Sequence, residues 1–166
     1  MVRVGQEKAP AMSRLSLSWS ETETEVSWPS LTTENAEVKS PDDPFYNCAA
    51  FVADDTERKW WPIDQEGYYW PEGFPRDDST ETILKTFEEL FGFERCEDGS
   101  FEVGYEKVVI FELGGAPQHL AKQLSTGEWI SKLGDLEDIV HDSPNNLNGP
   151  YYGQAVRFLK KKVSAQ

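Results

Sequence analysis

The chain has 166 residues, a length that suits one domain. Its six Trp, nine Phe and six Tyr provide enough apolar surface for a core, so the chain is not disordered throughout. The net charge of −14 excludes nucleic acid as the expected partner, because like charges repel the phosphate backbone. No apolar run reaches the length of a membrane helix, and residues 1–10 lack the hydrophobic run of a secretory signal, so we expect a cytoplasmic protein without membrane contact.

Residues 1–40 are rich in Ser, Thr and Glu, a composition that buries too little apolar surface to order itself. Apolar residues alternate with serines between Leu15 and Trp19, which hints at a short strand. The polar composition instead favours a flexible tail over residues 1–40, with one docked piece near Trp28. We therefore expect a single domain over residues 41–163.

The first ordered segments combine a short helix with an aromatic loop. Residues 45–54 are predicted to be helical, and Asn47 is placed to cap this helix, since its side chain can accept a backbone N–H of the first turn. Pro and Gly interrupt the aromatic stretch at residues 60–71, so no regular element of any length forms there. Its apolar content indicates an ordered loop packed over the core or over a cleft.

An amphipathic helix is predicted next. Asp78, followed by Glu81 three residues later, is a capping-box pattern and marks the helix start. Gly92 marks the helix end, because glycine readily adopts the left-handed conformation after the last turn. The apolar stripe between them has helical spacing and consists of Ile83, Leu84, Phe87, Leu90 and Phe91.

The second half of the chain is predicted to be β. The continuous apolar run at residues 108–111 suits a central strand, and residues 118–124 and 129–133 are expected to form a hairpin. Residues 152–160 are expected to close the sheet. Helices followed by strands indicate the α+β class, with N-terminal helices packed on a small antiparallel sheet.

The hairpin allows two registers, which place His119 differently. If Leu124 pairs with Trp129, the large apolar side chains share one face and His119 lies on the polar face. This register sorts apolar from polar side chains, so we prefer it. A one-residue bulge would instead place His119 and Ser131 on a shared face.

Cys48 and His119 are the candidate catalytic residues. A cysteine at a helix start is expected to have a lowered pKa, because unpaired backbone N–H groups there stabilise the thiolate. His119 begins a strand after a Gly/Pro turn, where its imidazole can project toward Cys48 and take the thiol proton. The alternatives are that Cys48 is a small buried residue and that His119 is satisfied by local backbone. His141 lies amid carboxylates and is interpreted as a solvated side chain and a fallback base.

Short motifs carry two resemblances. A helix-leading Cys48, followed by an antiparallel sheet with His119 opening a strand, resembles the papain-like NlpC-type hydrolases. This resemblance implies a papain-like fold with Cys48 as nucleophile, His119 as general base and Ser131 at the third position. NlpC-type enzymes usually carry His, Asn, Asp or Glu there, and Asp135 can substitute if the strand runs on. The chain also resembles an uncharacterised bacterial family over residues 44–160, through the stretches NCAA, WWP, GYYWP, PQHLA, WISKLG and YGQAVRFL.

Two functions from different classes follow. The first is a thiol hydrolase acting on a peptide, isopeptide or amide bond of a peptide or protein substrate, with aromatic and polar side chains lining the cleft. The second is a non-catalytic acidic interaction domain on the same fold, adaptor or immunity-like, that binds a basic partner. No cofactor is expected, and no metal, because the Cys and His residues lack metal-site spacing. The expected substrate-binding residues are Asn47, Trp61, Tyr69 and Trp70.

Overall fold

The computed structural model describes residues 15–163, which belong to the α+β class and form a mostly antiparallel sheet with few helices. The seven-stranded sheet has the order β1-β8-β7-β6-β5-β9-β4, and all its neighbouring strands are antiparallel. Its strands are β1 (Ala36–Ser40), β4 (Glu94–Cys96), β5 (Tyr105–Leu113), β6 (Ala116–Gln123), β7 (Trp129–Lys132), β8 (Asp138–His141) and β9 (Gln154–Lys162). The short strands β2 (Lys59–Trp60) and β3 (Tyr68–Tyr69) form a separate parallel pair. The helices are α1 (Glu21–Ser27), α2 (Cys48–Val52), α3 (Thr80–Phe91) and the 3-10 helix η2 (Pro144–Leu147).

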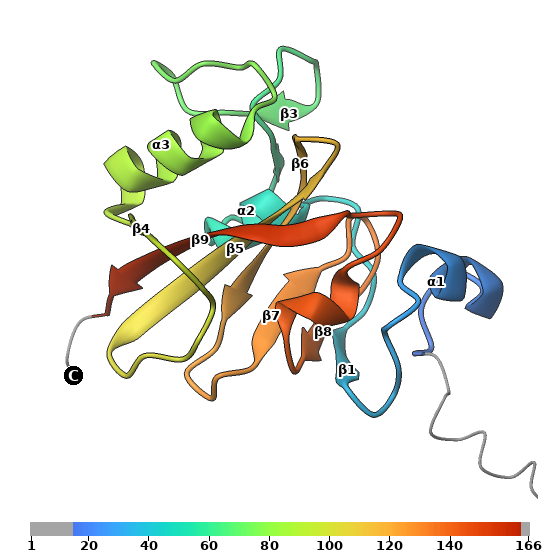
Figure 1. Ribbon diagram of the computed structural model, residues 1–166. Helices are drawn as coiled ribbons and strands as arrows, with labels where there is room; N and C mark the ends of the chain where they lie inside the picture. The colour runs from blue at the N-terminus through green and yellow to red at the C-terminus, as the bar shows by residue number, and fades with distance from the viewer. Residues whose placement is uncertain (1–14, 164–166) are drawn as a thin grey trace, which may run out of the picture.

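The sheet carries an apolar cluster on each face. Along β5, Val108 and Ile110 belong to a first cluster, which also contains residues of α2 and α3. Val109 and Phe111 belong to a second cluster, which also contains the N-terminal residue Trp28. This alternation is what a strand covered on both faces requires. Figure 1 shows α3 across one side of the sheet and α1 near its β1 and β8 edge. Of the helices in the described part of the chain, none combines the length and apolarity needed to cross a bilayer.

Residues 15–40 are part of the folded domain and do not form the flexible tail expected from composition. A capping box starts α1, and β1 pairs with β8. Trp28 and Leu31 are fully buried in the second cluster. A few large apolar side chains thus anchor a segment whose average composition is polar. The remainder of the expected tail, residues 1–14, lies outside the described residues.

The short helix α2 is fixed at its start by Asn47. The Oδ1 atom of Asn47 accepts hydrogen bonds from the backbone N–H groups of Ala50 and Trp60, and its Nδ2 donates to the Trp60 carbonyl. Ala49 and Ala50 are buried, and their small side chains let the helix lie close to β6. The predicted cap is confirmed, and it holds Cys48 at the first position of the helix.

The helix α3 begins one residue later than expected. Ser79 is its N-cap, because the Ser79 side chain accepts a backbone N–H of the first turn, whereas Asp78 precedes the helix with a φ of 53°. Gly92 ends the helix in the left-handed conformation, as predicted. The buried stripe is narrower than expected, because Leu90 is 44% exposed. Its fully or almost fully buried apolar members are Ile83, Leu84 and Phe87.

The β6–β7 hairpin does not use the preferred register. Gln123 pairs with Trp129, while Leu124 lies in the turn and donates its N–H to the Glu128 carbonyl. The preferred pairing of Leu124 with Trp129 is therefore wrong. That register would turn polar side chains away from the core. In the structure the buried Gln123 faces the apolar side, and its Nε2 donates to two backbone carbonyls, those of Gly99 and Gly127.

This register determines where the candidate base lies. His119 pairs with Phe111 across the β5–β6 ladder, so both side chains project from the same face. Ser131, two residues after the Trp129 of the second cluster, shares that face. His119 and Ser131 therefore lie on the apolar face of the second cluster, whereas α2 packs on the first.

Candidate functional site

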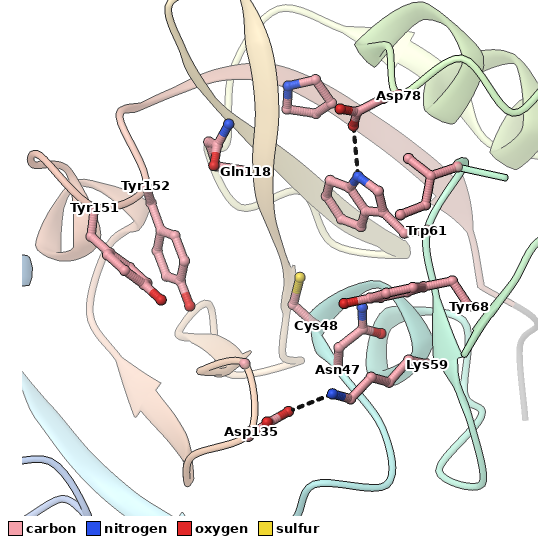
Figure 2. A pocket seen from close by; sticks show the side chains of 13 residues that line it. Asn47, Cys48, Lys59, Trp61, Tyr68, Asp78, Gln118, Asp135, Tyr151 and Tyr152 are labelled. Carbon is pink, nitrogen blue, oxygen red and sulfur yellow. Dashed lines mark hydrogen bonds and ion pairs between the residues drawn. The ribbon is translucent and has the colours of Figure 1, made fainter. Parts of the chain in front are cut away.

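A pocket of about 390 Å³ opens at the N-terminus of α2. Its walls come from α2, β2, β3, the start of β6 and the loop that precedes β9. In Figure 2 the Cys48 sulfur points into the pocket, on the side of Gln118 and Trp61, and Tyr151 and Tyr152 form the opposite wall. The pocket thus gives a small ligand access to the sulfur of an otherwise buried cysteine.

The Cys48 side chain is a neutral thiol in this pocket. Burial raises its pKa to about 11, and hydrogen bonds from the backbone N–H groups of Leu120, Ala49 and Cys48 itself oppose this rise without cancelling it. The charge of Lys132 acts in the same direction as these hydrogen bonds. The lowered pKa expected at a helix start is therefore wrong, because the five-residue α2 offsets too little of the loss of water.

The His119 imidazole is fully buried on the second-cluster face. Its ring stacks on Tyr152, with 4.1 Å between the ring centroids and 7° between the planes, and its edge meets Phe111. Neither ring nitrogen has a hydrogen-bond partner among residues 15–163. Burial, and then the neighbouring His141, hold the pKa of His119 well below its ordinary value, so the ring is neutral.

Cys48 and His119 lie near neighbouring positions of strand β6, Cys48 on the side of α2 and His119 on the second-cluster face. β6 pairs with β7 only at Lys122 and Gln123. Earlier in β6, the backbone N–H of Leu120 donates a hydrogen bond to the Cys48 sulfur. Leu120 directly follows His119, so the sulfur lies beside the strand position of the histidine. Tyr152 also connects the two residues, because its ring covers His119 and its side chain lines the Cys48 pocket.

Ser131 hydrogen-bonds His141. The Ser131 Oγ atom lies 2.8 Å from His141 Nε2, and His141 Nδ1 lies 2.9 Å from the Ser143 carbonyl oxygen. A carbonyl only accepts, so Nδ1 carries the proton and the Ser131 hydroxyl donates to Nε2. Burial lowers the pKa of His141 to about 4. The interpretation of His141 as a solvated side chain is wrong, because the second cluster and its own hydrogen bonds enclose it.

Two of the four residues expected to bind substrate line the pocket. Asn47 lines it, although its amide atoms are committed to backbone hydrogen bonds. Trp61 lines it and donates its indole N–H to Asp78 at 2.7 Å. Tyr69 instead packs against Trp60, and Trp70 is buried in the first cluster. The aromatic loop therefore contributes mainly to the core.

Lys59 and Asp78 are pocket residues that were not predicted from the sequence. Lys59 forms a 2.9 Å ion pair with Asp135, the alternative third residue, at one end of the pocket, and Asp78 lies at the other end (Figure 2). In a chain with 30 acidic residues, no local signal distinguishes these charges from solvated ones. The adjacent aromatic residues Tyr151 and Tyr152 were the detectable signal. Residues 15–163 contain no group of His, Cys, Asp and Glu side chains that could hold a metal ion.

Comparison with known proteins assigns most of the chain to one domain family. The model of a domain of unknown function, DUF7689, matches residues 37–160. The match begins within β1 and ends within β9, so it contains the pocket, Cys48 and His119, whereas α1 and Trp28 precede it. No curated protein and no solved structure matches the chain.

Proposed function

The chain belongs to the DUF7689 domain family, and we propose that it is a thiol hydrolase that cleaves an amide bond of a peptide or protein. Cys48 is the proposed nucleophile and His119 the proposed general base. One observation carries this proposal: the Cys48 sulfur opens into a pocket and accepts a hydrogen bond from the amide that directly follows His119. Such chemistry also needs an imidazole within reach of the thiol, and His119 is the residue before that amide on β6.

In the proposed reaction both groups start neutral. The sulfur attacks the substrate carbonyl carbon while the thiol proton passes to the His119 imidazole. The carbon–nitrogen bond then breaks, and the amine leaves with that proton. Water hydrolyses the resulting thioester, which releases the acid and restores the Cys48 thiol. The raised pKa of Cys48 and the lowered pKa of His119 support a neutral resting pair over a preformed ion pair.

The order of the elements supports a papain-like arrangement of the NlpC type. A helix that begins with Cys48 precedes an antiparallel sheet, and His119 lies near the start of β6. The third position departs from that pattern, because Ser131 is engaged by His141. We propose that Tyr152 takes over part of its role, since stacking fixes the plane of the His119 ring.

The reaction of Cys48 with iodoacetamide is expected to depend steeply on pH. Only the thiolate reacts, and below a pKa of about 11 its fraction grows about tenfold with each pH unit, so the rate rises continuously from pH 7 to pH 10. Intact mass against time in a Cys96→Ser variant measures this rate, and a Cys48→Ser variant reports Cys96 as the control. A plateau near pH 8 would contradict the neutral thiol.

Turnover tests the proposed hydrolase directly. The purified protein is incubated with a mixed library of peptides, isopeptides and peptide amides, and new termini are detected by mass spectrometry. Cys48→Ala is expected to abolish cleavage, and the matched Cys96→Ala to leave it unchanged. Cleavage that survives in Cys48→Ala rejects Cys48 as the nucleophile, and no cleavage either by the unmodified chain or by a variant in which His119 is exposed rejects the hydrolase.

A non-catalytic acidic interaction domain is the second candidate. The neutral Cys48, the covered His119 and the net charge of −14 favour it. We propose that such a domain, adaptor or immunity-like, binds a basic protein surface with an affinity that falls as salt is added. Binding of a basic partner that persists in Cys48→Ala, together with an absence of turnover, selects this function.

A further inference from the structure

A continuous row of aromatic rings joins the N-terminal segment to His119. Trp19 stacks on Trp28 with 5.4 Å between the ring centroids, and Trp28 meets Tyr152 at 5.5 Å. Tyr152 in turn stacks on His119 at 4.1 Å. The edge of Tyr151 also meets Trp28, at 5.5 Å. The row therefore connects a segment that lies outside the pocket to the proposed base.

Tyr152 has little freedom within this row. Gly149 and Gly153, on either side of it in the chain, pair through two backbone hydrogen bonds of 2.9 and 2.8 Å. Gly153 also packs so closely on β5 that an added side chain would overlap the Glu112 carbonyl. Trp28, which is fully buried, packs against the Tyr152 ring. The local backbone and Trp28 together determine where the Tyr152 ring lies.

The covered His119 is in an unfavourable environment for an imidazole. Both of its nitrogen atoms are buried and make no hydrogen bond within the described part of the chain, a state that buried polar groups normally avoid. Its titratable neighbours, Tyr152 and His141, are themselves held neutral by burial. Water would hydrogen-bond to these nitrogen atoms if the Tyr152 ring moved away, so close packing must hold the Tyr152 ring over His119.

We propose that Trp28 is a positioning residue that holds Tyr152 over His119, so that residues 15–31 keep the imidazole away from water and substrate. The importance of His119 as a base rests on the proposed function, whereas the cover rests on the contacts alone. The segment precedes the matched residues 37–160, so the cover comes from outside the matched domain. Displacement of the segment would release Tyr152, the residue that both lines the pocket and covers His119.

Comparison of Trp28→Ala with Phe87→Ala tests the cover. Both substitutions remove a fully buried aromatic ring, but Phe87 belongs to the first cluster, on the other face of the sheet. The chain has two histidines, so an NMR titration of the ring C–H signals isolates His119 once a His119→Asn spectrum has assigned it. We expect Trp28→Ala to raise the pKa of His119 toward about 6.5 and to speed alkylation of Cys48 at pH 7 by about tenfold or more. Phe87→Ala is expected to do neither.

The outcomes separate the cover from the hydrolase. An unchanged His119 titration in folded Trp28→Ala, or an equal change in Phe87→Ala, overturns the proposal. If Trp28→Ala does not fold, Trp19→Ala serves instead, because the half-buried Trp19 stacks on Trp28. A smaller shift of the same sign then supports the cover, and no shift overturns it. Exposure of His119 without turnover in any variant supports the cover and rejects the hydrolase.

Discussion

Replacement of Gly153 by alanine is expected to lower the free energy of unfolding by more than about 4 kcal/mol, a large share of the stability of a typical domain. The added Cβ would overlap the Glu112 carbonyl oxygen and lie 2.8 Å from the Leu113 Cα. These are backbone atoms of β5, and they cannot turn aside as the end of a flexible side chain can. Urea unfolding followed by tryptophan fluorescence measures the loss.

Gly115→Ala is the matched control for this substitution. Gly115 has a φ of 85°, close to the 81° of Gly153, but the space around its missing Cβ is open. Gly115→Ala is therefore expected to lower the free energy of unfolding by about 1 kcal/mol, the cost of placing a residue with a Cβ in the left-handed conformation. Equal losses in the two variants would show that the β5 backbone moves to admit the methyl group.

A chain shortened by residues 1–36 is expected to lose cooperative thermal unfolding. The deletion removes the fully buried Trp28 and Leu31 and uncovers the face around Phe111. Loss of two such side chains costs about 2–5 kcal/mol each, against a total domain stability of about 5–15 kcal/mol. Circular dichroism during heating measures the transition.

A shorter deletion, of residues 1–14 alone, is the control for the longer one. It retains Trp28 and Leu31, so it distinguishes their burial from a general effect of shortening the chain. A sharp transition in the chain that begins at residue 37 would show that the matched domain folds without the N-terminal segment. A loss of the same size in both shortened chains would mean that these two side chains are not its cause.

Local signals predicted the elements whose ends are marked by one specific residue. Asn47 and Gly92 act through bonds and backbone conformations close to them in the chain, so their roles can be read from the sequence. The N-terminal segment was wrongly expected to be flexible, because its average composition is polar and does not reveal the two anchoring side chains, Trp28 and Leu31. The burial of these two residues depends on distant elements, among them β8, which pairs with the strand that follows them.

In the candidate site, too, local sequence could not predict the features that depend on distant parts of the chain. The sequence placed Cys48 at the start of a helix, which is confirmed, but the sign of its pKa shift depends on burial by distant parts of the chain. The hairpin register was missed because Gln123 finds carbonyl partners that only the folded chain supplies. Lys59 and Asp135 are far apart in the chain and pair only across the pocket.

The pairing of β1 with β8 has a consequence for synthesis of the chain. Ala36 lies opposite His141, about a hundred residues later, and ribosomes build the N-terminal strand first. Until β8 emerges, β1 has no neighbouring strand, and Trp28 and Leu31 lack the later part of their core. Closure of such a distant pair is slow, because the entropy of a long loop is lost before the contacts form. The nascent chain therefore exposes the apolar side chains and the unpaired strand of its N-terminal segment through most of its translation. A ribosome-associated chaperone that binds exposed apolar segments would act in this interval.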